Sequence, residues 1–234
     1  MHVIGHRGWP ARYPDNSLPG LLAASRVCDA VEVDVRRSSD GLLVLSHDEC
    51  IGNLEVASND WESLGEVDIG GGVRPMLLEE AISSLPGTPL FIEIKNVPGF
   101  PGFEPDHRIA LEAASKARPT DVVISFNWMS MDRVRNRFPD TPTGLNVGRT
   151  GDLTEAVAKC REDGHDYLVV DVDLLLGSAP VGLEEVSVLV WSTNKVETFG
   201  EVIPELVGRG VSGIIADDPL TTRRLLRSPD DHQG

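Results

Sequence analysis

The chain has 234 residues, of which 41% are hydrophobic and 25% are charged, a composition typical of a globular protein and not of a disordered or fibrous one. Its formal net charge of -16 would repel the phosphate backbone of nucleic acids and the anionic surface of a membrane, so we expect neither as a partner. The length is that of one barrel-sized domain, and we expect a single domain over residues 1–234.

The cysteines and the start of the chain suggest a compartment. Cys28, Cys50 and Cys160 are odd in number and lack the spacing of a metal site, which favours reduced thiols. The chain opens on a strand-like segment without the basic and apolar regions of a signal peptide. No apolar run approaches the length of a membrane span. We therefore expect a cytoplasmic protein without stable membrane association.

Short apolar, β-branched segments alternate with stretches of helical periodicity along most of the chain. The expected strands are residues 2–8, 30–37, 90–95, 122–127, 143–147, 167–173, 186–194 and 213–217, with a strand-like hairpin extension at 42–47. The expected helices are residues 17–25, 78–85, 107–116, 129–137, 153–161, 196–207 and 219–226. Eight strands with intervening helices predict a TIM-type (β/α)8 barrel, with an open doubly wound sheet as the alternative.

Residues 49–74 interrupt this alternation. They contain Gly52, Gly65 and the run Gly70-Gly71-Gly72, and their periodicity is weak. We predict a loop or small insertion after the second strand, lying over the rim of the barrel that carries the site, where it would shape access.

Two expected strands carry charges where a barrel strand should be apolar. Glu32 and Asp34 alternate with valines, so both carboxylates share one face of their strand while the valines occupy the other. Two carboxylates held together away from water need a cation or a proton. For an isolated motif of this kind, a half-exposed sheet that simply alternates polar and apolar residues would be the better explanation.

The same arrangement returns in the next strand, where Glu93 and Lys95 share a face. This recurrence favours a functional interpretation, because a barrel strand is covered outside and filled inside. Glu32, Asp34 and Glu93 would form an oxygen-rich site for Mg²⁺ or Ca²⁺, and Lys95 would hold a phosphate oxygen beside the metal.

Two histidines are expected on the same rim of the barrel. His6 follows the first strand together with Arg7, and His47 follows the strand-like extension. Either histidine alone is also explained as a surface or core residue. Breaking a phosphodiester requires an activated attacking oxygen and a protonated leaving alkoxide, which two imidazoles can supply. A metal together with Arg7 and Lys95 would stabilise the charge on the remaining phosphate oxygens.

These motifs resemble, in order and spacing, those of the glycerophosphodiester phosphodiesterase family. The matching pieces are His6-Arg7-Gly8, Pro14-Asp15-Asn16-Ser17, Glu32-Val33-Asp34-Val35 and His47-Asp48. Weaker likenesses continue to Asp217-Asp218-Pro219, so the resemblance covers almost the whole chain. It implies a TIM-type barrel that hydrolyses glycerophosphodiesters to sn-glycerol 3-phosphate and an alcohol. Asp15 and Ser17 depart from the family, which has Glu and Thr at these positions.

The resemblance also implies a role for individual residues. His6 and His47 would be the general acid and base, in an order that is left open. Glu32, Asp34 and Glu93 would bind one divalent metal ion, Mg²⁺ or Ca²⁺. The remaining candidates are Arg7 and Lys95 for phosphate, Asn16 and Asp48 as supporting residues, and Phe126 and Trp191 as either pocket walls or core aromatics.

Other functions are compatible with the same sequence. A lysophospholipase D-type activity would need an apolar channel, which the composition of residues 49–74 does not favour. A binding barrel without catalysis would be expected to lack a histidine or a metal carboxylate, and a different barrel metalloenzyme, such as a sugar isomerase, is possible on fold alone. The alcohol group of the substrate and the oligomeric state are left open.

Overall fold

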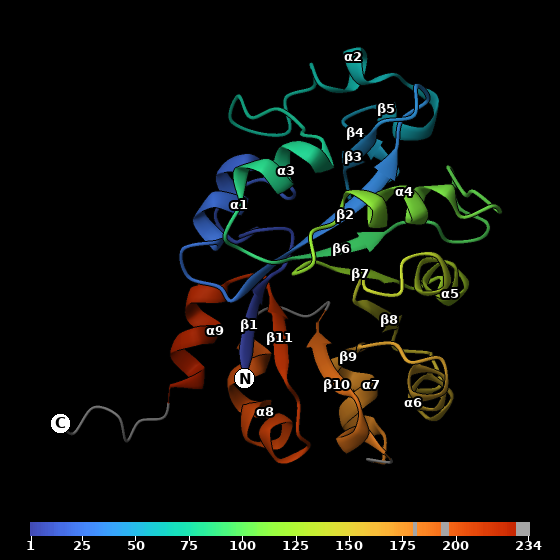
Figure 1. The fold of residues 1–234 in the computed structure, drawn as a ribbon. Helices are drawn as coiled ribbons and strands as arrows, with labels where there is room; N and C mark the ends of the chain where they lie inside the picture. Colours follow the sequence, from blue (N-terminus) through green and yellow to red (C-terminus); the bar gives the residue numbers. More distant parts are fainter. Residues whose placement is uncertain (180–181, 193–196, 228–234) are drawn as a thin grey trace.

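The computed structural model describes residues 1–179, 182–192 and 197–227. Within these residues, parallel strands form a closed barrel in which β1 pairs with both β2 and β11 (Figure 1). The eight strands are β1 (His2–Gly5), β2 (Ala30–Arg37), β6 (Leu90–Ile94), β7 (Val122–Ser125), β8 (Thr143–Val147), β9 (Tyr167–Asp171), β10 (Ser187–Trp191) and β11 (Gly213–Ala216). The predicted TIM-type barrel is confirmed, and closure excludes the open doubly wound sheet.

Helices surround the barrel (Figure 1). They are α1 (Leu18–Ala24), α3 (Leu78–Ser84), α4 (Arg108–Lys116), α5 (Trp128–Arg137), α6 (Leu153–Glu162), α7 (Val172–Gly177), α8 (Glu197–Gly208) and α9 (Pro219–Leu226). Local capping explains several of their starts. Ser17 accepts a hydrogen bond from the Gly20 N–H at the start of α1, and Asp152 accepts two from the first turn of α6.

Helix α7 is absent from the sequence prediction, which extended a strand over residues 167–173. The strand β9 ends at Asp171, whose buried carboxylate accepts hydrogen bonds from the N–H groups of Asp173 (2.9 Å) and Leu174 (3.2 Å). These bonds satisfy the first free donors of a helix, so the chain turns into α7 at this point.

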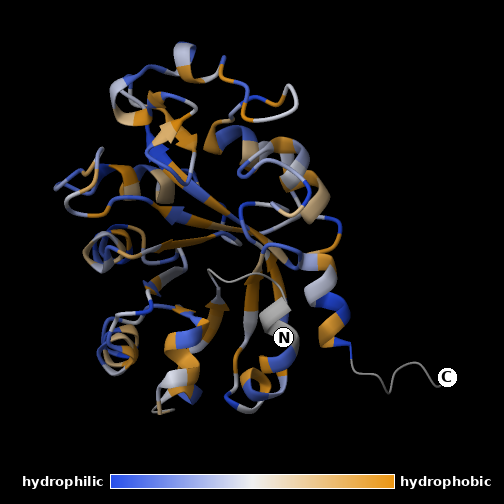
Figure 2. Cartoon of the chain, turned by 180° about the vertical axis from the view of Figure 1, so that it is seen from behind, coloured by the Kyte–Doolittle hydropathy of each residue, from blue (hydrophilic) through white to orange (hydrophobic). Residues whose placement is uncertain are grey.

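Successive side chains of each strand point to opposite faces of the sheet, so the core has two parts. Val31, Val33 and Val35 belong to the cluster between barrel and helices, whereas inward side chains such as Phe91 and Ile124 fill the barrel. Burying each such side chain contributes about 1.5–3 kcal/mol. In Figure 2 the strands are largely hydrophobic and the surrounding helices carry polar surface. Glu32 and Asp34 lie on the inward side, as predicted.

The segment after β2 contains more regular structure than the sequence indicates. Strand β3 (Leu43–Leu45) pairs antiparallel with the end of β2. It is followed by the hairpin β4 (Cys50–Ile51) and β5 (Leu54–Glu55), the 3-10 helix η1 (Val56–Ser58) and α2 (Trp61–Leu64). Val44, Ile51, Val56 and Leu64 form a separate apolar cluster within it. Elements of two to four residues are too short to show a period in the sequence.

Two expectations extend outside the described residues. The strand predicted to end at residue 194 is described only as far as β10 and Ser192, and the start of the helix predicted from residue 196 is not described. A second 3-10 helix, η2 (Leu183–Glu185), precedes β10. Among the helices that the structure describes, none is long and apolar enough to cross a bilayer.

Candidate functional site

A pocket of about 580 Å³ opens where the strands end at their carboxyl termini. Its base is apolar, with Ile124, Val169 and Ile215 from β7, β9 and β11. Most of the residues predicted from the sequence line it together: His6, Arg7, Glu32, His47, Glu93, Lys95, Phe126 and Trp191. Asp34 does not line the pocket itself, but it contacts Lys95, which does.

Three carboxylates are buried next to one another. Glu32 and Asp34 are 2% and 1% exposed on β2, and Glu93 is 8% exposed on β6. The register of the two strands pairs Asp34 with Glu93. One oxygen from each of the three side chains lies within 4.8 Å of the other two. The predicted cluster is therefore present, with oxygen atoms spaced for a single cation.

Each carboxylate has one oxygen that accepts a hydrogen bond from a neutral N–H group. The three bonds run from Arg7 N to Glu32 Oε2 (2.8 Å), from Asn16 Nδ2 to Asp34 Oδ2 (2.9 Å) and from Asn146 Nδ2 to Glu93 Oε2 (3.0 Å). The Asn16 side chain also accepts a bond from the Asp34 backbone N–H (3.0 Å). These contacts hold the carboxylates without neutralising them.

Positive charge reaches only part of this cluster. Lys95 Nζ lies 2.8 Å from Asp34 Oδ1 and also contacts Glu93 Oε1, whereas Glu32 Oε1 is buried without a hydrogen-bond partner among the described residues. Burial, followed by the adjacent Asp34 carboxylate, raises the pKa of Glu32 to about 8. Burial alone would also raise the pKa of Asp34, but Lys95 and Arg7 hold it below its usual value. The unpartnered oxygen and the crowded negative charge fit a bound divalent cation.

The loop after β1 brings Arg7 to the cluster through an unusual backbone conformation. Arg7 has φ +49°, which directs its N–H towards Glu32, and its guanidinium contacts Asp15 (2.9 Å) and Asp34 (3.2 Å). Gly8 follows with φ +91°, and a Cβ there would lie 2.8 Å from the Gly20 carbonyl carbon. Only glycine allows this close packing of the loop on α1.

Each histidine of the pocket is paired with a carboxylate through Nδ1. His6 Nδ1 lies 2.6 Å from Asp217, which follows β11, and His47 Nδ1 lies 2.7 Å from Asp48. Burial would lower the pKa of His6, but the hydrogen bond with Asp217 and the charge of Glu32 raise it. The His47 loop is held by the Arg36 guanidinium, which donates to the His47 carbonyl (3.0 and 3.1 Å).

The two predicted aromatic residues form one wall. The rings of Phe126 and Trp191 meet edge to face, with centroids 5.9 Å apart and planes at 88°. Both line the pocket, and Phe126 is exposed, so it is not a core aromatic.

A second hollow of about 520 Å³ adjoins the pocket and shares His47, Glu93, Lys95 and Phe126 with it. Its other lining residues are Arg36, Asp48, Glu49, Cys50, Val97 and Phe100. Glu49 and Cys50 are the first residues of the segment 49–74, which therefore borders the site region at this hollow.

Sequence reasoning did not assign a role to Asp217 or Asn146. Asp217 stands at the end of the last expected strand, and the rule that barrel sites use strand ends could have identified it. Asn146 alternates with Leu145 and Val147 in β8, so it is an inward polar residue on an otherwise apolar strand. This is the same signal that identified Glu32 and Asp34.

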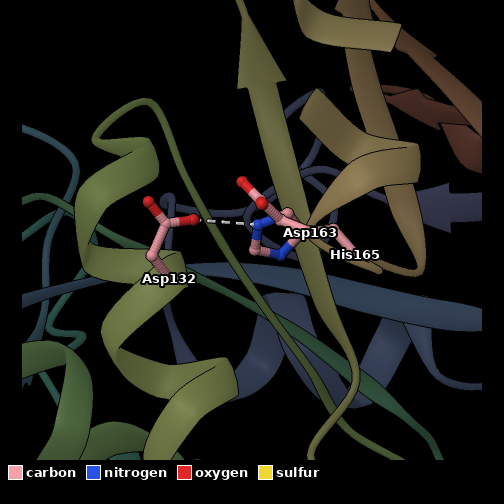
Figure 3. Close-up of side chains that lie close together, drawn as sticks. All are labelled: Asp132, Asp163 and His165. Carbon is pink, nitrogen blue, oxygen red and sulfur yellow. Dashed lines mark hydrogen bonds and ion pairs between the residues drawn. The ribbon is translucent and has the colours of Figure 1, made fainter. Parts of the chain in front are cut away.

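A second acidic group lies at the opposite, amino-terminal end of β8 and β9 (Figure 3). Asp132 of α5, Asp163 after α6 and His165 come together there. Lys159 Nζ lies 3.0 Å from Asp132 and 2.5 Å from Asp163. The buried His165 ring contacts Thr143 through Nδ1 (2.9 Å) and Asp132 through Nε2 (3.2 Å). Since a lysine and a threonine already satisfy these groups, the arrangement is an ion-pair network.

Comparisons with known proteins agree with this architecture. A glycerophosphodiester phosphodiesterase of Caldanaerobacter subterraneus is 26% identical over 245 residues, covering 96% of this chain and 97% of that protein. The crystal structure of a Parabacteroides distasonis glycerophosphodiester phosphodiesterase superposes with a TM-score of 0.80, at 22% identity and 96% coverage of both chains. An Oleispira antarctica phosphodiesterase, in complex with the product sn-glycerol-3-phosphate, gives a TM-score of 0.81 at 20% identity and 97% coverage of both chains.

The family comparison extends over nearly the whole barrel, from the first histidine of the pocket to the last helix. Because the model of the glycerophosphoryl diester phosphodiesterase family matches residues 6–221, this chain belongs to that family.

Proposed function

We propose that this protein hydrolyses glycerophosphodiesters to sn-glycerol 3-phosphate and an alcohol, with the help of one divalent metal ion. The observation that carries the proposal is a pocket that two carboxylate-paired histidines line together with Glu32 and Glu93, two members of the cluster of three buried carboxylates. The family membership supports the same reaction. The product in the Oleispira antarctica structure is the glycerol phosphate that this reaction would release.

Glu32, Asp34 and Glu93 would hold the metal ion, Mg²⁺ or Ca²⁺. When bound, such an ion stabilises negative charge that develops on phosphate oxygens. Arg7 and Lys95 line the same pocket and would contact the phosphate from the protein side. Asn16 would keep Asp34 in place through the two hydrogen bonds that join them.

The two histidines would transfer the protons of the reaction. One imidazole takes a proton from the attacking oxygen and the other donates a proton to the departing alkoxide. Asp217 and Asp48 occupy Nδ1 of His6 and His47, so Nε2 is the nitrogen that would face the substrate. The hydrogen bond from His6 Nδ1 to the Asp217 carboxylate favours a protonated His6, which supports His6 as the proton donor and His47 as the base.

The two adjoining hollows suggest how a diester would lie. A phosphate near His47 and Lys95, which line both hollows, would place glycerol on one side and the alcohol on the other. Glu49 and Cys50 border the second hollow, which supports a role for the segment 49–74 in access to the site. The three cysteines form no disulfide, consistent with the cytoplasm as the proposed compartment.

A lysophospholipase D-type activity is the second candidate. The apolar side chains of Val97, Phe100 and Phe126 in the second hollow favour it, because an acyl chain needs apolar surface. The same hollow also carries Arg36, Asp48 and Glu49, which suit a small polar alcohol better. We therefore rank it below the hydrolysis of water-soluble diesters.

The test is a metal-titrated assay on the purified full chain. After removal of metal with EDTA, Mg²⁺ or Ca²⁺ is added with glycerophosphocholine, glycerophosphoethanolamine or lysophosphatidylcholine. Release of sn-glycerol 3-phosphate from the first two substrates is the expected result. Faster release of choline from lysophosphatidylcholine would favour the second candidate. Binding of these diesters without turnover of any of them would contradict the proposal and favour a binding barrel.

A further inference from the structure

Asn146 is polar, although the packing of its strand does not require a polar side chain at this position. Its neighbours Leu145 and Val147 point outward into the core between barrel and helices, while Asn146 points inward and is 3% exposed. Contacts at Asn146 itself and at Gly144, two residues earlier, hold this strand in place. Trp128 Nε1 donates to the Asn146 carbonyl (2.9 Å), and a Cβ on Gly144 would meet Ile124 and Tyr167 side chains at 3.0 Å.

The Glu93 carboxylate determines how the Asn146 amide is turned. Asn146 Nδ2 donates to Glu93 Oε2 at 3.0 Å, and the reverse orientation would place two acceptor oxygens against each other. In the observed orientation Oδ1 is buried and has no hydrogen-bond partner among the described residues. A buried unsatisfied acceptor is destabilising, and an apolar side chain of similar size would avoid it. The bond to Glu93 is thus what the asparagine supplies at this position.

This bond completes a set of three. Glu32 and Asp34 are held by neutral donors from the loop after β1, namely the Arg7 N–H and the Asn16 amide. Glu93 is held in the same way from β8, two strands away in the barrel. In each case a neutral donor holds one carboxylate oxygen. Of the three remaining oxygens, Glu32 Oε1 has no partner among the described residues, while Asp34 Oδ1 and Glu93 Oε1 share Lys95 Nζ. The three carboxylates approach within 4.8 Å of one another.

We propose that Asn146 is a positioning residue that fixes Glu93 for a divalent cation. This role rests on the metal-dependent function proposed above. A neutral donor restricts the carboxylate to one orientation without adding a positive charge of its own, so it orders the ligand without competing with the cation. Lys95 already contacts Oε1 of Glu93, and a second lysine in place of Asn146 would add a further competitor for the cation.

The test measures metal binding directly, using Mn²⁺ as the probe because it takes the same oxygen ligands as Mg²⁺ and Ca²⁺. EDTA-stripped wild type and Asn146→Leu are titrated with Mn²⁺, and the free ion is followed by electron paramagnetic resonance. Loss of a hydrogen bond to a ligating carboxylate should raise the Mn²⁺ dissociation constant about 10- to 100-fold. At saturating Mn²⁺ the kcat for glycerophosphocholine should return close to the wild-type value, because Asn146 acts through Glu93.

Thr143→Val is the matched control. Thr143 is buried at the other end of the same strand and loses a hydrogen bond to His165 (2.9 Å) in this variant. A general weakening of β8 would therefore appear in both variants as a lower melting temperature. Only Asn146→Leu should change Mn²⁺ affinity.

Two results would overturn the inference. Equal Mn²⁺ affinity in wild type and Asn146→Leu would remove the positioning role while leaving the proposed reaction intact. A wild-type protein that binds no Mn²⁺ would remove both the metal centre and this role. If Asn146→Leu does not fold, Asn146→Ala carries the same expectation, because it introduces no additional volume.

Discussion

Two groups at opposite ends of the barrel each bring three potential metal ligands within 4.8 Å of one another, yet they differ in what surrounds them. At the carboxyl end, three buried carboxylates accept bonds from neutral donors, and Glu32 Oε1 has no partner among the described residues. At the amino end, Lys159 contacts both Asp132 and Asp163, and both nitrogens of His165 are bonded. Figure 3 shows the bond between Asp132 and His165. Asp163 is also 47% exposed, so water can solvate it.

The comparison shows that proximity of acidic residues does not by itself identify a cation site. Solvent and a lysine stabilise the amino-terminal group, and such exposed ion pairs contribute little to stability or function. At the carboxyl end a lysine, Lys95, also contacts Asp34 and Glu93, but Glu32 is buried with an oxygen that has no partner among the described residues, which is costly unless a ligand uses it. We therefore expect substitutions at the two ends to affect different properties.

The largest difference should be in turnover. His47→Ala should lower kcat for glycerophosphocholine by about 10²- to 10⁴-fold, the usual contribution of a general acid or base. Its side chain is 40% exposed, so folding should be little affected. His165→Gln at the other end should leave kcat per folded molecule unchanged. Retention of wild-type kcat by His47→Ala would remove it from the proton-transfer steps.

The next difference should be in metal-dependent stability. Calcium at about 100 times its dissociation constant should stabilise the wild type by about 2.7 kcal/mol, which corresponds to a rise in melting temperature of about 5–10 °C. Asp34→Asn should lose most of this rise, whereas Asp163→Asn should keep it. Differential scanning fluorimetry with and without Ca²⁺ measures both. An equal loss in the two variants would show that the amino-terminal group also binds the ion.

A smaller effect should appear in the pH dependence of folding. Burial lowers the pKa of His165, and the bond with Asp132 only partly opposes this shift. The unfolded chain then binds a proton more readily than the folded one, so stability is full above the unfolded histidine pKa of about 6.5 and falls as pH decreases below it. The slope can reach about 1.4 kcal/mol per pH unit.

Urea unfolding at pH 7.5, 6.5 and 5.5 tests this expectation. The loss of unfolding free energy between pH 6.5 and 5.5 should be smaller in His165→Gln than in the wild type. Parallel curves for the two proteins would show that His165 is not the group responsible.

The smallest effect should be a displaced pH profile. Asp217→Asn removes the partner that raises the pKa of His6, so activity that depends on protonated His6 should be lost at a lower pH than in the wild type. The adjacent Asp218 provides the control, because its carboxylate caps α9 through Thr221. Asp218→Asn should lower stability without moving the kcat profile. An unshifted profile in Asp217→Asn would assign the proton-donor role to another group.

Much of the site could be predicted because the decisive signals are local. The two-residue period of a strand places Glu32 with Asp34 on one face whatever lies around them, and eight strand signals separated by helical ones lead to a barrel. The resemblance of the His6, Glu32 and His47 motifs to one family added the reaction. Each individual signal, whether a strand period or a motif, is contained in residues a few positions apart.

The tertiary structure decided which distant residues meet. Barrel closure brings Asp217 to His6 and Asn146 to Glu93, pairs separated by 211 and 53 residues, and no local period encodes such contacts. It also ended β9 at Asp171, because the side chain that looked like a strand residue caps a helix. Finally, the tertiary structure gave the two acidic groups different surroundings. Whether a carboxylate is buried or solvated, and whether a lysine reaches it, depends on packing that only the folded chain creates.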